Sequence, residues 1–194
     1  AGDDVVVQGD WLDIDGQARI QGDHVDIGAD ESDGTVWSEG PYAIVRVATD
    51  GDDANDGSSW SLAKRTLQAG IDAASALGGE VWVQAGTYNE QITLRSYSYL
   101  FGGFAGTESA RDERDWTSNP TILDGQQGGS VVSILAGYQV SRIDGFTIRN
   151  GSVGISCSAS SPAIASNTIT GNSRGGIRCA DHSSPTIANN AITG

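Results

Sequence analysis

An internal repeat near the end of the chain is the feature that most constrains its fold. Residues 154–157 (GISC) return as residues 176–179 (GIRC), and residues 161–171 (SPAIASNTITG) return as residues 184–194 (SPTIANNAITG). A repeat period of about 22 residues indicates a solenoid, in which each repeat is one structural unit stacked on the last.

Apolar residues alternate with polar ones inside each repeat. Ile155 and Cys157 form one alternating pair, Phe146 and Ile148 form another, and Gly, Asn or Ser-Pro separates such runs. This alternation predicts several short strands per turn of the solenoid and no helix within the turns.

A fainter copy of the repeat lies upstream. Ile143 and Ile148 precede Ile164 and Ile169 by nearly the same interval, and Ile122 precedes Ile143 by that interval again. We therefore expect four turns that share one period. A leucine-rich repeat has a similar period, but leucine is too scarce here for its ladder, which favours a parallel β-helix with strands about 4.8 Å apart.

Stacking of equivalent positions predicts two ladders. Asn167 is expected to lie over Asn190, where the amides satisfy backbone groups at a bend between strands. Cys157 is expected to lie over Cys179. A disulfide is conceivable in an oxidising compartment, but direct parallel register strains its torsion, so we expect reduced, buried cysteines.

One segment departs from the strand pattern. Residues 61–77 (SLAKRTLQAGIDAASAL) carry apolar residues at helical spacing and are followed by two glycines as a stop signal; the apolar positions are Leu67, Ile71, Ala74 and Leu77. This amphipathic helix lies between apolar runs at residues 42–47 and 80–83. We expect it to cover the first rung, because an open solenoid end exposes core and strand edges.

The stretch from residue 47 to residue 94 resembles the N-terminal capping region of the pectin-lyase-like superfamily. Its marks are an Asp-Gly-rich loop, a tryptophan, the helix, and the phrases VWV and AGTYNE. The resemblance covers residues 42–194 and implies an all-β fold, a right-handed parallel β-helix (solenoid) with an N-terminal amphipathic capping helix. The implied domain at residues 41–194 comprises a cap at 41–80 and rungs at 81–194.

Residues 1–40 precede this cap and are strongly acidic. The phrase VDIGADE at residues 25–31 resembles the closing phrase of many bacterial β-helix modules, so residues 1–40 are expected to be the tail of a preceding module. The chain also stops inside a repeat. It is therefore expected to be an excised piece of a tandem array, a chain whose last rungs were lost, or a subunit whose open end a neighbour completes. We favour an array or filament of identical modules stacked head-to-tail, with residues 1–40 completing the neighbouring open end.

The composition limits which kinds of molecule the chain is expected to bind and where it is expected to be found. The formal net charge is -14, and residues 1–60 carry fifteen acidic side chains against Arg19 and Arg46. This balance argues against nucleic acid, which requires a basic face. No long apolar span predicts a membrane helix. Abundant glycine, no methionine and a single lysine, Lys64, predict an extracellular or cell-surface module.

Catalysis on acidic polysaccharides is the activity that the resemblance raises. A lyase would need outward carboxylates that bind calcium beside a basic residue. The available groups are scattered along the rungs: Asp144, Arg149, Arg174, Arg178, Asp181 and His182. A glycoside hydrolase would need two convergent carboxylates, for which Asp124 and Asp144 are the one remote candidate pair. We therefore expect no catalytic site in these residues, and a polysaccharide lyase or glycoside hydrolase is the alternative.

Two binding sites are predicted without catalysis. A turn-rich loop gathers oxygen ligands suited to Ca²⁺, although it lacks the EF-hand spacing and is equally typical of a solvated turn; its candidate ligands are Asp50, Asp52, Asp53, Asn55 and Asp56. Exposed aromatic rings near the charged excursion at residues 105–120 could stack on sugars, which makes carbohydrate binding the alternative function; the candidates are Trp116, Tyr97 and Tyr99.

Overall fold

The computed structural model describes residues 20–21, 24–25, 43–76, 78–135 and 141–194, and the chain divides into two units, Ala1–Pro41 and Tyr42–Gly194. In the first unit the described residues form a small antiparallel pair, β1 (Ile20–Gln21) with β2 (His24–Val25). Most of residues 1–40, including most of the phrase at 25–31, lies outside the described residues. Their predicted role as a module tail stays a prediction.

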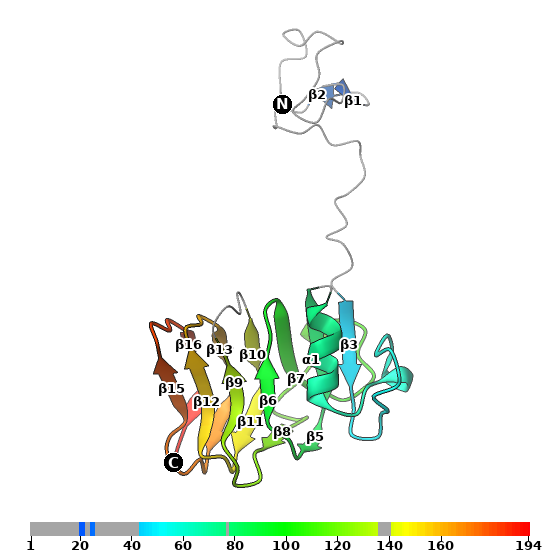
Figure 1. The fold of residues 1–194 in the computed structure, drawn as a ribbon. Helices are drawn as coiled ribbons and strands as arrows, with labels where there is room; N and C mark the ends of the chain where they lie inside the picture. The colour runs from blue at the N-terminus through cyan, green and yellow to red at the C-terminus, as the bar shows by residue number, and fades with distance from the viewer. Residues whose placement is uncertain (1–19, 22–23, 26–42, 77, 136–140) are drawn as a thin grey trace. The chain divides into compact units, whose positions relative to one another are not determined.

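The second unit is built from three parallel sheets (Figure 1), so each turn contains several short strands, as the repeat predicted. The first sheet contains β3 (Ala43–Val47), β4 (Gly79–Gln84), β7 (Ser98–Phe104), β10 (Arg142–Asp144), β13 (Ala163–Ala165) and β16 (Thr186–Ala188). The second contains β5 (Gly86–Tyr88), β8 (Thr121–Asp124), β11 (Phe146–Arg149), β14 (Thr168–Thr170) and β17 (Ala191–Ile192). The third contains β6 (Ile92–Leu94), β9 (Ser130–Ile134), β12 (Val153–Ser158) and β15 (Ile177–Ala180).

The chain visits the three sheets in turn and then returns to the first, one strand further along. Each return pairs a new strand in parallel with the one before it, which is the winding of a right-handed parallel β-helix. The predicted fold class is confirmed.

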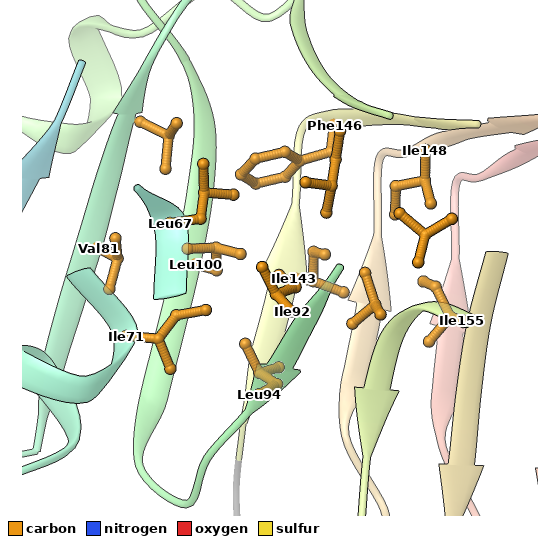
Figure 2. Close-up of a cluster of buried hydrophobic side chains, with 14 of the residues drawn as sticks. Leu67, Ile71, Val81, Ile92, Leu94, Leu100, Ile143, Phe146, Ile148 and Ile155 are labelled. Atoms are coloured by element: carbon orange, nitrogen blue, oxygen red, sulfur yellow. The ribbon is translucent and has the colours of Figure 1, made fainter. Parts of the chain in front are cut away.

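Inward side chains of successive rungs stack into apolar ladders (Figure 2). Ile143 pairs with Ile164, Ile148 pairs with Ile169, and Ile155 pairs with Ile177. The first five of these are fully buried, and each such side chain contributes about 1.5–3 kcal/mol to folding. The hydrophobic core thus runs along the axis of the solenoid.

The upstream extension of the period is wrong at one position. Ile122 pairs with Thr147 and lies partly exposed, whereas Leu123 occupies the buried ladder of Ile148. The strand partner that precedes Ile143 is Leu100. The even spacing fails here because the chain leaves the solenoid between β7 and β8, so the intervening residues do not follow the rungs.

Helix α1 (Leu67–Ser75) packs against β3 and β4. Its buried face contains Leu67, Ile71 and Ala74, as predicted, while Leu77 is outside the described residues. The helix is shorter than predicted at its start, because residues 60–62 form a separate 3₁₀ turn, η1 (Trp60–Leu62). No helix within the described residues is long and apolar enough to cross a membrane.

Candidate functional site

The outer face of the first sheet carries bulky side chains where the solenoid would meet solvent. Trp82, Phe101 and Asp144 pair in register on β4, β7 and β10, and all three are buried. Outward residues of a sheet are buried only when another segment covers them. Arg111 and Arg114 of the excursion at residues 105–120 cover Phe101 and Asp144. Trp82 is covered by Phe104 and Arg46. This covered face is a candidate site.

Arg114 holds the excursion against the sheet. Its guanidinium donates to the Gly102 carbonyl at 3.0 Å and to Asp144 Oδ1 at 2.6 Å. It also lies over the rings of Phe101 and Trp116, at 5.0 and 4.9 Å from their centroids. The Asp144 side chain is only 2% exposed and accepts a second ion pair from Arg142. This buried, hydrogen-bonded pairing fixes the position of the loop.

Two glycines permit the close approach. Gly103 has φ 96°, and a Cβ there would lie 2.6 Å from the Cα of Trp116. Gly145 has φ 83°, and a Cβ there would lie 2.9 Å from Nη1 of Arg114. A larger residue at Gly103 would therefore clash with the backbone of the excursion, and one at Gly145 would be strained by its positive φ and by the Gly102 carbonyl.

Glu108 shapes the start of the excursion, which also contains a 3₁₀ turn, η2 (Arg111–Glu113). The Glu108 carboxylate accepts hydrogen bonds from the backbone N–H groups of Ala105, Gly106 and Thr107. Burial opposes ionisation, but these hydrogen bonds outweigh it and keep the pKa of Glu108 below its usual value. The Glu108 carbonyl accepts a hydrogen bond from Trp60 Nε1, which joins the excursion to the cap.

A groove of about 520 Å³ opens beside the excursion. Trp116, with 44% of its surface exposed, and Thr117 form one wall. The opposite wall is the corner between the first and second sheets on the last two rungs, formed by Ser166, Asn167, Thr168, Asn189 and Ala191. We name this the Trp116 groove.

The predicted aromatic residues are not brought together in it. Trp116 lines the Trp116 groove, but Tyr97 and Tyr99 do not. Tyr97 is exposed at the start of β7, and Tyr99 packs at the edge of the Trp82, Phe101 and Phe104 cluster. A saccharide in the groove would therefore meet one aromatic ring.

The predicted calcium loop is organised around a lysine. Lys64 Nζ donates to the backbone carbonyls of Asp53 and Asn55, at 3.1 and 2.6 Å. The Asp53 carboxylate accepts from Arg65 N, Thr66 N and the Thr66 hydroxyl. Burial disfavours its charge, but these bonds keep the pKa of Asp53 below its usual value.

The remaining candidate ligands of this loop also have partners or lie apart. Asp52 and Asp56 accept backbone N–H groups from Ala54 and Ser58, and the Asn55 amide donates to Ala63. Asp50 is exposed in a turn. Across the described ranges no three His, Cys, Asp or Glu side chains converge as a metal site. Calcium binding stays a prediction, which melting curves with Ca²⁺ and with a chelator would test.

Each acid considered for catalysis has a partner, and for Asp124 and Asp144 that partner is an arginine. Asp124 accepts from Arg149 Nε at 3.0 Å and from the Asn150 amide at 2.8 Å. Burial works against its charge, yet hydrogen bonds including one from Gln126 N keep the pKa of Asp124 below its usual value. Asp144, bound by two arginines, belongs to a different sheet. Asp181 bonds Ser158, and three more candidates are exposed: Arg174, Arg178 and His182.

The structure places both predicted ladders in register. Asn167 accepts from Phe146 N, donates to the Ile143 carbonyl, and donates from its amide to Asn190 Oδ1. The left-handed backbone falls one residue earlier than the amide ladder, at Ser166 and Asn189.

The cysteines stack in the same way on the third sheet. Cys157 pairs with Cys179, and both are free thiols. Cys157 is buried and Cys179, on the next rung, is exposed, so the expectation of burial holds for one of them. Burial, together with the neighbouring Cys179, raises the pKa of Cys157 to about 12.

Sequence reasoning missed Glu90, which supplements the N-cap residue of helix α1, Thr66. The Glu90 carboxylate accepts from Leu67 N and Gln68 N, two donors left unpaired at the helix start. Burial raises the pKa of Glu90 despite these bonds. The available signal was the AGTYNE phrase, in which this glutamate follows β5 by two residues.

A second amide was missed as well. Asn172 accepts from Gly151 N and donates to the Ile148 carbonyl. It therefore satisfies backbone groups at the next bend of the rung, as Asn167 does at its own bend. The signal was a further asparagine shortly after Asn167, at the end of the following strand.

Comparisons with known proteins place the chain in one family. A family model described as "Protein of unknown function (DUF1565)" matches residues 49–194, which is well over half of the chain. Searches of curated proteins and of solved structures gave no match. The matched span contains helix α1, the three sheets from β4 onward and the Trp116 groove. The chain therefore belongs to the DUF1565 family of proteins of unknown function.

Proposed function

We propose that this chain is a non-catalytic, extracellular structural module of pectin-lyase-like type, whose rungs are extended by a β-segment of a neighbouring copy. The observation that carries the proposal is the exposure of two ladder isoleucines. Ile187 and Ile192 are each 48% exposed, whereas Ile164 and Ile169, their partners one rung earlier, are fully buried. Another β-layer over β16 and β17 would bury both side chains.

The edges of these strands support stacking as well as burial. A strand at the edge of a sheet presents unpaired N–H and C=O groups that pair readily with another strand. Helix α1 packs against β3 and β4 at the opposite end of the sheet order. We propose that the covering segment comes from residues 1–40 of the neighbouring copy, which makes the contact heterologous and the assembly a filament.

The proposal predicts that a charge on the ladder disrupts assembly. Ile187→Asp is expected to abolish concentration-dependent self-association in analytical ultracentrifugation, because a carboxylate would be buried without a partner. Thr186→Asp is the matched control, since it places the same charge on the same strand at the adjacent, outward position. Equal behaviour of the two variants would refute stacking through this face.

Removal of residues 1–36 tests which segment covers the rung. Electron microscopy of the truncated chain is expected to show no filaments, while residues 43–194 keep their circular dichroism spectrum. Intact filaments from the truncated chain would show that a different segment makes the contact.

A further inference from the structure

We propose that the Trp116 groove is a binding site for a neutral saccharide, independent of the stacking proposed above. One wall presents an indole and the other presents short polar side chains. This combination matches a sugar ring, which has an apolar C–H face and a periphery of hydroxyl groups. At about 520 Å³ the groove is within the size range of small-molecule sites.

The indole is preorganised for this role. The Arg114 guanidinium covers one face of Trp116, and Arg114 is itself fixed by Asp144 and Gly102. Gly103 packs directly under the Trp116 backbone. The ring is therefore held in place before a ligand arrives, and its exposed surface faces the groove at little entropic cost on binding.

Polar groups on the opposite wall are available to a ligand. Thr168 and Asn189 are exposed, and their side chains make no hydrogen bond within the described part of the chain. Asn167, by contrast, is engaged in its ladder and acts as the fixed floor. A hydroxyl and an amide at neighbouring rungs can donate to and accept from adjacent sugar hydroxyls.

Charge selects neutral over acidic sugars. No charged residue lines the Trp116 groove. Arg114, which lies over the Trp116 ring, is ion-paired with buried Asp144, a carboxylate that it shares with Arg142. A uronate in the groove would lose hydration without gaining an ion pair, so the site is expected to discriminate against it.

Isothermal titration of the full chain tests the site with defined probes. The panel contains neutral hexamers of glucose, mannose and xylose in their common linkages, and a galacturonate hexamer as the acidic counterpart. At least one neutral hexamer is expected to bind at millimolar concentration or better, and the galacturonate hexamer is not. Binding by none of the neutral hexamers, or by the acidic one alone, would overturn the proposal.

Three substitutions locate the binding. Trp116→Ala is expected to weaken it by about tenfold or more, because stacking on the ring is lost. Thr168→Val removes a hydroxyl at nearly constant volume, and Asn189→Gly removes an amide while tolerating the φ of 55° at that position. Each of these two is expected to weaken binding about three- to tenfold without loosening the excursion.

A matched control tests whether binding requires the ring in the groove or any exposed aromatic ring. Tyr97 is as exposed as Trp116 but does not line the groove, so Tyr97→Ala is expected to leave the affinity unchanged. Unchanged affinity in both Thr168→Val and Asn189→Gly would show that the polar wall of the groove does not contact the sugar, and would overturn the proposal. Ultracentrifugation of these variants is expected to be normal, which distinguishes this site from the stacking face.

Discussion

At the scale of single residues, Asn167 has the most demanding role among the polar side chains of the rungs. It is buried and bonds both Phe146 N and the Ile143 carbonyl. Asn167→Ala leaves these two buried backbone groups without partners, so the free energy of unfolding is expected to fall by about 2–4 kcal/mol. Urea denaturation measures this. Asn190→Ala, in a half-buried ladder position, is expected to cost less, and an equal loss would contradict the ladder argument.

The two thiols are predicted to differ in reactivity. At pH 8 iodoacetamide is expected to label Cys179 at least about tenfold faster than Cys157, because the thiolate is the reactive form and Cys157 is both buried and protonated. With a pKa of about 12, Cys157 is almost wholly protonated at pH 8, and its thiolate fraction rises about tenfold for each pH unit over the next few units. Mass spectrometry of tryptic peptides measures both rates, and labelling in urea is the control in which the difference should vanish.

Residues in the repeat were predictable and residues in loops were not. The spacing of Asn167 and Asn190 follows directly from the repeat, so their register was inferred correctly from sequence. The pairing of Arg114 with Asp144 joins residues 30 positions apart across a non-repeating excursion, and no local pattern indicates it. Lys64 was likewise absent from the predicted calcium loop, because its ammonium reaches that loop only through the fold.

At the scale of elements, helix α1 offers a test in which packing opposes helix propensity. Gly70 lies inside the helix and is buried against the first sheet. An alanine Cβ there would stand 2.6 Å from Cγ2 of Val47 and 3.1 Å from Cγ1 of Val81. Overpacking costs about 1–3 kcal/mol, against a propensity gain of about 1 kcal/mol. Gly70→Ala is therefore expected to lower the melting temperature.

Ser75→Ala is the matched change on the same helix. Its hydroxyl bonds only the Asp72 carbonyl at an exposed position, so the stability is expected to change by no more than about 0.5 kcal/mol. An increase in melting temperature for Gly70→Ala would mean that the helix stands further from β3 and β4 than described.

The spacing of apolar residues predicts the buried face of this helix but not its first residue. Apolar spacing predicted a helix over residues 61–77, and its buried face is correct for Leu67, Ile71 and Ala74. The start is wrong because the Asp53 carboxylate accepts from Arg65 N and Thr66 N, and Thr66 is held extended as the N-cap. A contact from a loop 12 residues away decides the helix boundary, and no pattern inside the helix reveals it.

At the scale of the whole molecule, the repeat predicts the solenoid architecture but not the excursion that interrupts it. The repeat period is nearly constant from β10 onward, where the spacing of paired residues is 21 for Ile143 and Ile164, 22 for Cys157 and Cys179, and 23 for Ile164 and Ile187. It fails between β7 and β10, where the excursion covers the first sheet. The candidate site arises from this failure, because Trp116 and its groove belong to the part of the chain that does not repeat.

A solenoid also predicts how stability is distributed along its axis. Ile148, Ile169 and Ile192 occupy one ladder on β11, β14 and β17, with the same residue type on consecutive rungs. The first two are fully buried and the third is 48% exposed. Because each rung contacts only its neighbours, substitution by alanine is expected to cost about 2–5 kcal/mol at Ile148 and Ile169 but less than half as much at Ile192.

The cost of Ile192→Ala, measured at low and at high protein concentration, tests whether the chain assembles through its last rung. In dilute solution, equilibrium denaturation is expected to give the small cost for Ile192→Ala. At concentrations where the chain stacks, Ile192 becomes buried by the neighbouring copy, and the cost is expected to approach that of Ile169→Ala. The Ile169 value should stay constant, since that rung is covered in either state. A small cost for Ile192→Ala at every concentration would mean that no second copy covers the last described rung.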